Sequence, residues 1–202
     1  MASIPYRIVF VRHGETDYNA EGRLQGQRDI PLNGRGRAQA SAIGRALRKA
    51  MPVEIAALEA ASAFSASPLI RTRQTMELAR AALGLAPARY ALEPALKELT
   101  FGEWEGLTWP QVAKRDPAGA RAREADKWNF APPGGESYAM LAARLQPWLE
   151  SLKADGFVVS HGGVARALMT LIAGVSPQAA ENADIWQGRA ILFAGGGLRW
   201  IG

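Results

Sequence analysis

The sequence contains two histidines, and each follows an apolar run of strand length and precedes a glycine. His13 follows the run 8–11 and one arginine, and His161 follows the run 157–159 and one serine. In open α/β sheets, ligands bind beyond the carboxyl ends of the strands. A glycine after each histidine, such as Gly162, lets a ligand approach the backbone closely. We therefore expect both imidazoles to reach one binding pocket.

Two arginines are expected near the same pocket. Arg12 directly precedes His13, so its side chain lies at the same loop rim. Arg71 falls in the first turns of a predicted helix that follows the apolar run 61–64, and helix N-termini with arginines bind anions. Because Arg71 and Arg73 are two residues apart, they point to different faces of this helix, and at most one enters the pocket.

Two histidines and two arginines, with no cysteine in the chain, favour phosphoryl transfer to histidine. A neutral imidazole is a nucleophile that needs no deprotonation, and the arginines neutralise the oxygens of the transferring group. The leaving oxygen also needs a proton donor. Glu98, Glu103 and Glu105 are the acidic candidates, and their spacing alone does not choose among them.

The elements that must position these groups alternate between strands and helices. Apolar residues recur at helical spacing in four segments, 43–50, 69–83, 141–152 and 164–172, most weakly in the second. Runs of strand length occupy 7–11, 61–64 and 157–159. Alternation of this kind indicates an α/β fold with a mainly parallel central sheet.

Length and composition fit one domain of residues 1–202, with 48% hydrophobic residues to form its core. The segment at about 98–135 is less regular and rich in Trp, Gly and Pro. We interpret it as an excursion that covers the site. Three glycines at 195–197 separate two apolar runs and predict a hairpin turn.

The residue counts exclude several classes of protein. With 0 cysteines, the chain has no disulfide framework, no Cys-ligated metal and no cysteine nucleophile. With 2 histidines, a metal site built mainly from imidazole is not expected. We therefore predict that the protein uses no metal and no cofactor.

The formal net charge of +5 is compatible with anionic partners, but a modest excess of surface arginine without a specific role is the preferred explanation of the charge alone. The chain has no basic cluster interleaved with aromatic residues, so we expect a small phosphorylated metabolite rather than nucleic acid. Its start lacks a secretory signal, and no segment approaches the ~18 apolar residues of a membrane helix. These features predict a cytoplasmic protein with no membrane partner.

Five blocks resemble, in order, the signature segments of the histidine phosphatase superfamily, also called the phosphoglycerate mutase-like family. They are 11–19 with its Arg-His-Gly-Glu-Thr motif and the continuation through 40, then 67–75, 98–106, 133–137 and 160–163. An Arg-His-Gly triplet alone would be weak, but five ordered blocks are specific. The resemblance implies a three-layer α/β/α sandwich and no metal.

The resemblance also implies roles for the residues at the matching positions. His13 would be the phosphorylated nucleophile, and Arg12, Arg71 and His161 would bind the phosphoryl group. Glu98 would donate a proton to the leaving group and later act as the base for water.

Four more positions in these blocks would help to bind the phosphoryl group: Asn19, Gln25, Gly26 and Gly162. The alternative explanations are a cap of the loop for Asn19 and a turn contact for Gln25. Glu136 and Ser137 are expected only to cap the helix that begins there. The aromatic residues Trp104, Trp109, Trp128 and Phe130 either line the substrate pocket or form a small core of their own.

Departures from the family pattern narrow the expected activity. The phosphoglycerate mutases carry an arginine and a tyrosine after the acid and a lysine nearby, whereas this chain has Leu99, Phe101 and Trp109 at these positions. The mutases also carry an Arg-Arg pair, which this chain does not contain. In the mutases such groups would bind a substrate carboxylate and hold a bisphosphate. We therefore predict a phosphomonoester hydrolase for small phosphorylated metabolites. A phosphoglycerate mutase and a non-catalytic phospho-ligand-binding module are the alternatives.

Overall fold

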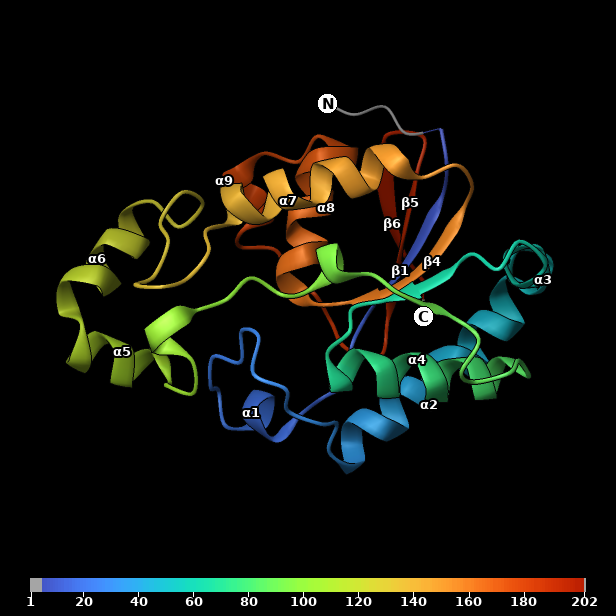
Figure 1. Ribbon diagram of the computed structural model, residues 1–202, viewed down its shortest axis with the longest axis horizontal. Coiled ribbons are helices and arrows are strands. Elements are labelled where there is room, and N and C mark those ends of the chain that lie inside the picture. Colours follow the sequence, from blue (N-terminus) through green and yellow to red (C-terminus); the bar gives the residue numbers. More distant parts are fainter. Residues whose placement is uncertain (1–4, 202) are drawn as a thin grey trace.

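A computed structural model describes residues 5–201 of the protein (Figure 1). A six-stranded sheet runs in the order β3-β2-β4-β1-β5-β6. The strands are β1 Ile8–Arg12, β2 Phe64–Ala66, β3 Ala91–Leu92, β4 Gly156–Ser160, β5 Ala190–Ala194 and β6 Gly197–Ile201. The pairs β1–β4, β2–β4 and β2–β3 are parallel, whereas β5 and β6 add an antiparallel edge. The predicted mainly parallel sheet is thus confirmed.

Helices cover both faces of this sheet and make the predicted three-layer α/β/α sandwich (Figure 1). On one face lie α2 Gly34–Ala50, α3 Pro52–Ala60 and α4 Ile70–Leu83. On the other lie α7 Tyr138–Ser151 and α8 Gly162–Ala173, with α9 Pro177–Ala180 beyond them. The remaining helical elements are α1 Asp17–Ala20, η1 Pro94–Leu96, η2 Gly102–Trp104, α5 Trp109–Arg115 and α6 Pro117–Ala125.

The alternation of side chains along the central strands explains why both faces are covered. In β1, Ile8 and Phe10 pack into the core under α7 and α8, while Val9 and Val11 pack into the core on the side of α2 and α4. All four are at most 3% exposed. Successive side chains of a strand point to opposite faces, so a central strand that is apolar at every position requires helices on both sides.

Two expectations about local structure need correction. The run 61–64 is not a strand: α3 ends at Ala60, Ser62 turns the chain with a φ of 51°, and β2 begins at Phe64. The segment 98–135 contains two short helices, α5 and α6, which lie away from the sheet (Figure 1). Each begins with a proline in its first turn, a position that proline favours. The glycine run at 195–197 does join β5 to β6 as a hairpin.

Among the helices of residues 5–201, none combines the length and apolar character required to cross a membrane.

Candidate active site

The two histidines lie side by side because the strands that precede them are neighbours. β1 and β4 pair in parallel with Arg12 opposite Ser160, and the His13 backbone N–H donates to the Ser160 carbonyl at 2.9 Å. The ring centroids of His13 and His161 are 5.3 Å apart. Both side chains are buried. The two imidazoles thus lie together at the carboxyl end of the sheet, where His13 lines a cleft and His161 is fully buried.

The environment of His13 leaves one of its ring nitrogens without a proton. Its Nδ1 lies 2.7 Å from the Gly14 carbonyl oxygen, which can only accept, so Nδ1 carries the proton and Nε2 keeps its lone pair. Burial lowers the pKa of His13 well below its ordinary value, and the cations Arg71 and Arg12 lower it further. The imidazole is therefore neutral near pH 7.

The tautomer of His161 follows from Ser67, a residue for which the sequence analysis assigned no role. His161 Nε2 lies 2.8 Å from Ser67 Oγ, and the same oxygen accepts from the Leu69 N–H at 3.4 Å. Because Ser67 Oγ can donate as well as accept, we assign it as the donor to Nε2, and this assignment places the proton of His161 on Nδ1. Burial, with Arg71 second, lowers the pKa of His161 well below its ordinary value. A neutral His161 thus has one N–H to offer.

The two arginines are held by backbone carbonyls rather than carboxylates. Arg71 donates to the carbonyls of Gly26 at 2.8 Å and Arg28 at 2.7 Å, and Arg12 donates to Ile185 at 2.6 Å. Burial lowers the pKa of Arg71 to about 10, although the nearby Glu98 acts to raise it. Arg71 therefore remains a cation near pH 7. Neutral partners fix the direction of both guanidinium groups, and among the described residues neither group forms a direct ion pair with a carboxylate.

Unsatisfied buried polar atoms concentrate at this place. Within residues 5–201, six buried side-chain nitrogen or oxygen atoms have no hydrogen-bond partner. Four of the six belong to the expected site: Arg12 Nε, Gln25 Oε1, Arg71 Nε and His161 Nδ1. Because such atoms are rare and cost about 1–3 kcal/mol each, their convergence indicates a polar ligand.

Glu98 is the acid that faces the site. It lines the cleft beside His13, and its oxygens accept from the backbone N–H of Gly163 at 3.0 Å and of Leu99 at 3.1 Å. A Cβ on Gly163 would lie 2.2 Å from Glu98 Oε1, so only glycine allows this approach. Glu105 instead binds the loop through Gln27, Thr100 and Phe101, and Glu103 is exposed.

The four additional positions in the family blocks also border the cleft: Asn19, Gln25, Gly26 and Gly162. Asn19 closes the cap of α1 as well, because its Oδ1 accepts from the Thr16 N–H, and Gln187 donates to the same oxygen. The Nδ2 amide of Asn19 is the part left for a ligand. Gly26 has a φ of +52°, a backbone conformation that favours glycine, and its carbonyl holds Arg71.

The cleft has a volume of about 310 Å³ and contains groups that the sequence analysis missed. They are Arg23, Arg123, Lys127, Tyr138 and Arg166. Burial raises the pKa of Tyr138, so its hydroxyl stays protonated near pH 7. These side chains come from separate elements, so no spacing in the sequence links them. Arg166 is the exception, because it lies on the predicted helix that follows His161, and this position could have indicated that it is near the site.

The aromatic residues of the segment 98–135 divide between the two expected roles. Trp104 is buried, stacks on Phe130 at 5.5 Å between ring centroids, and forms a small core with Leu24 and Val112. Trp109 is 39% exposed and lines the cleft. Trp128 stacks on Tyr138. Ser137 caps α7, as expected, through the Met140 N–H.

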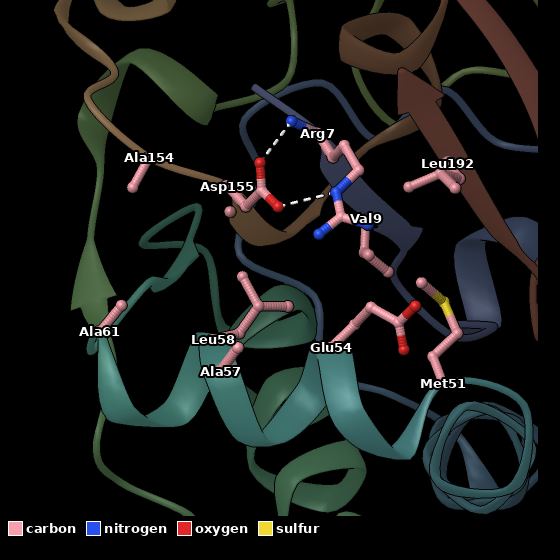
Figure 2. A pocket seen from close by; sticks show the side chains of 11 residues that line it. Arg7, Val9, Met51, Glu54, Ala57, Leu58, Ala61, Ala154, Asp155 and Leu192 are labelled. Atoms are coloured by element: carbon pink, nitrogen blue, oxygen red, sulfur yellow. Dashed lines mark hydrogen bonds and ion pairs between the residues drawn. The ribbon is translucent and has the colours of Figure 1, made fainter. Parts of the chain in front are cut away.

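The opposite end of the sheet holds a second cavity of about 190 Å³ (Figure 2). Its walls are mostly apolar side chains, including Val9, Leu58 and Leu192, and its one drawn ion pair joins Arg7 to Asp155. It contains neither histidine. In the described part of the chain, no three His, Asp or Glu side chains gather as ligands for a metal ion would.

The sequence matches the histidine phosphatase superfamily (branch 1) over residues 8–192, and the chain belongs to this superfamily. A glucosyl-3-phosphoglycerate phosphatase of Mycobacterium tuberculosis is 32% identical over 175 residues, which cover 80% of this chain and 73% of that protein. A 2,3-bisphosphoglycerate-dependent phosphoglycerate mutase of Beijerinckia indica is 28% identical over 200 residues, which cover 92% of this chain and 90% of the mutase.

Among solved structures, the mycobacterial glucosyl-3-phosphoglycerate phosphatase in complex with VO3 superposes with a TM-score of 0.78. Its sequence is 30% identical, and the match covers 96% of each chain. These similarities confirm the superfamily that the sequence blocks predicted. The protein is an enzyme of the histidine phosphatase superfamily, of the phosphatase type.

Proposed function

We propose that the protein hydrolyses phosphomonoesters of small metabolites through a phosphohistidine at His13. The observation that carries this proposal is the convergence of four unsatisfied polar atoms around two neutral imidazoles. Arg12 Nε, Arg71 Nε and His161 Nδ1 are donors with no partner in the protein. A phosphoryl group offers acceptor oxygens for these donors and a phosphorus atom for His13 Nε2.

In the proposed first step, His13 Nε2 attacks phosphorus. The N–P bond forms while the bond from phosphorus to the leaving oxygen breaks, and Glu98 donates its proton to that oxygen. Arg12 and Arg71 balance the charge on the phosphoryl oxygens, and the His161 Nδ1–H donates to one of them. The products of this step are the alcohol, phosphorylated His13 and the Glu98 carboxylate.

In the proposed second step, water replaces the alcohol in the cleft. The Glu98 carboxylate takes a proton from water, the oxygen attacks phosphorus, and the bond to His13 Nε2 breaks. Inorganic phosphate leaves, and both Glu98 and the neutral His13 return to their starting states. The Gly14 carbonyl holds the Nδ1 proton throughout, so the ring keeps the correct orientation.

We further propose that the chain acts as one domain in which the segment 98–135 covers the site. Phe101, Trp109, Arg123 and Lys127 from this segment line the cleft around His13, which supports this role. The proposed partner is a small phosphorylated metabolite, with no nucleic acid and no membrane. The proposed location is the cytoplasm, and the mechanism uses protein groups without a metal or cofactor.

The mutase alternative differs in the fate of the phosphohistidine. The Beijerinckia indica relative is a phosphoglycerate mutase, so mutase activity is the alternative to be tested. A mutase must return the phosphoryl group to a sugar acid instead of water. Interconversion of phosphoglycerates primed by 2,3-bisphosphoglycerate, faster than release of inorganic phosphate, would establish the mutase. The proposed nucleophile, phosphate-binding cations and acid are all present, and this complete set argues against a module that only binds phosphorylated ligands.

The experiment that tests the proposal is hydrolysis of p-nitrophenyl phosphate in excess EDTA by wild type and His13→Ala. We expect turnover by wild type and a loss of at least about a thousandfold in the variant. Loss of wild-type activity on adding EDTA would contradict the metal-free mechanism. Equal activity of the two proteins would contradict the role of His13.

A further inference from the structure

Four cations line the cleft beyond the two arginines assigned to the phosphoryl group; one of them, Arg23, forms an ion pair with Glu21, and three remain. Arg123 lies on α6, Lys127 follows that helix, and Arg166 lies on α8. In residues 5–201, none of the three forms an ion pair with a carboxylate. Their placement therefore concentrates positive charge on one side of the cleft.

Neutral groups hold these three cations in place. Lys127 Nζ donates to the Glu181 backbone carbonyl at 2.6 Å and to Asn182 Oδ1 at 3.0 Å. Arg166 Nε donates to the Ala183 carbonyl at 3.1 Å. The guanidinium of Arg123 stacks on the ring of Trp109, 4.1 Å from its centroid. Such contacts orient the cations and leave their charges available.

Arg166 joins the phosphoryl site to the outer cations. A Cβ built on Gly162 would lie 3.4 Å from Arg166 Nη1 and 3.5 Å from Arg12 Nε, so both guanidinium groups border the same glycine. Burial lowers the pKa of Arg123 and of Lys127, and the charge of Arg166 lowers both further. The carboxylates of Glu181 and Glu124 act in the opposite direction on Arg123, and Glu181 does so on Lys127 as well. The cations repel one another, and an added anion would relieve this repulsion.

A charge count shows that one phosphoryl group does not require all of these cations. A phosphomonoester carries about 1.5 to 2 negative charges near pH 7, and Arg12 with Arg71 balances them. We infer that Arg123, Lys127 and Arg166 bind a second anionic group on the leaving-group side of the substrate. The substrate class is then a phosphomonoester whose alcohol carries a carboxylate or a second phosphate.

The shape of the molecule leaves room for such an alcohol. A neighbouring hollow of about 560 Å³ shares Trp109, Arg123 and Lys127 with the cleft. The leaving group can extend from phosphorus past Trp109 toward this hollow. This inference rests on the proposed function, because it assigns the leaving group of the same reaction.

Two matched pairs of esters test the inference and distinguish the two anions. Glycerol 3-phosphate and 3-phosphoglycerate share an alkyl phosphate and differ by a carboxylate. Fructose 6-phosphate and fructose 1,6-bisphosphate differ by a second phosphate. We expect wild type to prefer the doubly anionic member of at least one pair by about tenfold or more in kcat/KM, because charge-assisted hydrogen bonds to the second anion add to the binding of the substrate.

Variants identify the residues responsible for this preference. Arg123→Gln and Lys127→Gln should each reduce the ratio of the two kcat/KM values several-fold, and the double variant should bring it to about one. Arg121→Gln is the matched control, because Arg121 is an exposed arginine of the same helix that does not line the cleft. The ratio should remain at the wild-type value in this control.

The outcomes separate the inference from the proposed function. Equal kcat/KM values within both pairs, or a preference that survives in the double variant, would overturn the second anion site while hydrolysis through His13 stands. A preference in the carboxylate pair alone, or in the phosphate pair alone, would support the inference and name the anion. No turnover of any of the four esters, with His13→Ala indistinguishable from wild type, would overturn both.

Discussion

The two ends of strand β1 use arginine in opposite ways. At the amino end, Arg7 donates to both oxygens of Asp155, from its backbone N–H at 2.8 Å and from Nε at 2.7 Å (Figure 2). At the carboxyl end, Arg12 donates to a carbonyl, and its buried Nε has no partner. One end of the strand satisfies its cation, and the other leaves its cation unpaired.

Strand β4 shows the same polarity as β1. Asp155 precedes this strand and completes the ion pair, whereas His161 follows it and keeps Nδ1 unpartnered. A buried polar atom without a partner costs about 1–3 kcal/mol, so a protein retains several together only where a ligand supplies the partners. The end of the sheet proposed to be reactive is therefore the one where the cation has no carboxylate in direct contact and polar atoms lack partners.

Among the cations, the largest effect is expected at Arg71, which can be compared directly with a second buried arginine on α4. Arg71 has no carboxylate partner, whereas Arg80 pairs with Glu59 at 2.8 Å. Arg71→Met should lower kcat/KM for p-nitrophenyl phosphate roughly 100- to 1000-fold, since a cation at the phosphoryl oxygens is lost. Steady-state kinetics of the folded protein provide the measurement.

Arg80→Met is the matched control for Arg71. It should lower the free energy of unfolding by roughly 3 kcal/mol, because Glu59 loses its buried partner, and kcat/KM per folded molecule should not change. Urea denaturation measures the first effect. A catalytic loss in Arg80→Met as large as that in Arg71→Met would break the distinction between paired and unpaired cations.

Glu98→Gln should show a smaller effect that depends on the leaving group. An alkyl phosphate needs a proton on its leaving oxygen, so we expect a loss of roughly 100-fold with glycerol 3-phosphate and a much smaller loss with p-nitrophenyl phosphate. Glu103→Gln, at an exposed position, serves as the control. Wild-type rates for Glu98→Gln on the alkyl ester would transfer the role of the acid to Glu105 or Glu103.

The two histidines should resist protonation in the free enzyme. Burial and the neighbouring arginines lower the pKa of His13 and of His161 well below the ordinary value of 6.5. NMR of the imidazole protons should show both rings neutral at about pH 6, and inorganic phosphate should shift their titration upward. A midpoint near 6.5 in the free enzyme would contradict the electrostatic picture of the site.

The same lowered pKa values affect stability in a direction that can be stated. Below about pH 6.5 the unfolded chain protonates its histidines while the native protein keeps them neutral, so unfolding takes up protons. The free energy of unfolding contributed by these groups therefore falls as the pH falls below their ordinary value. Urea denaturation between about pH 7.5 and 6 measures the slope. A rise in stability over this range would contradict the prediction.

The smallest effect is expected at the opposite end of the sheet. Arg7 and Asp155 have side chains that are 49% and 35% exposed, so solvent screens their ion pair. Asp155→Asn should lower the free energy of unfolding by less than about 1 kcal/mol and leave kcat/KM unchanged. A marked loss of activity in this variant would show that the two ends of the strand are not functionally separate.

The part of the site that lies on strand ends could be predicted from the sequence. His13 and His161 each follow a strand in a similar sequence context, and this similarity predicted that they lie near each other. The helical spacing of Arg71 and Arg73 predicted that they point to different faces, and Arg71 is buried whereas Arg73 is exposed. The choice of Glu98 needed either the family resemblance or the structure. Its contact with Gly163 joins positions 65 residues apart, which spacing does not reveal.

The outer part of the cleft could not be predicted in the same way. Arg123 and Lys127 belong to the segment of α5 and α6, which lies away from the sheet (Figure 1), yet they line the same cleft as His13. These helices have 7 and 9 residues and begin with prolines, so they are too short for a clear apolar period. The sequence predicts a strand at 61–64, whereas β2 begins at Phe64, because Ala61 and Ala63 extend the apolar run back into a turn.

The most direct test of the account is to identify the phosphorylated residue during turnover. The enzyme is mixed with a radiolabelled phosphomonoester, quenched rapidly in base, digested and analysed by peptide mass spectrometry. The account predicts an acid-labile phosphoryl group on His13 that is absent from His13→Ala. Turnover without any label on His13, or with the label on His161, would contradict it.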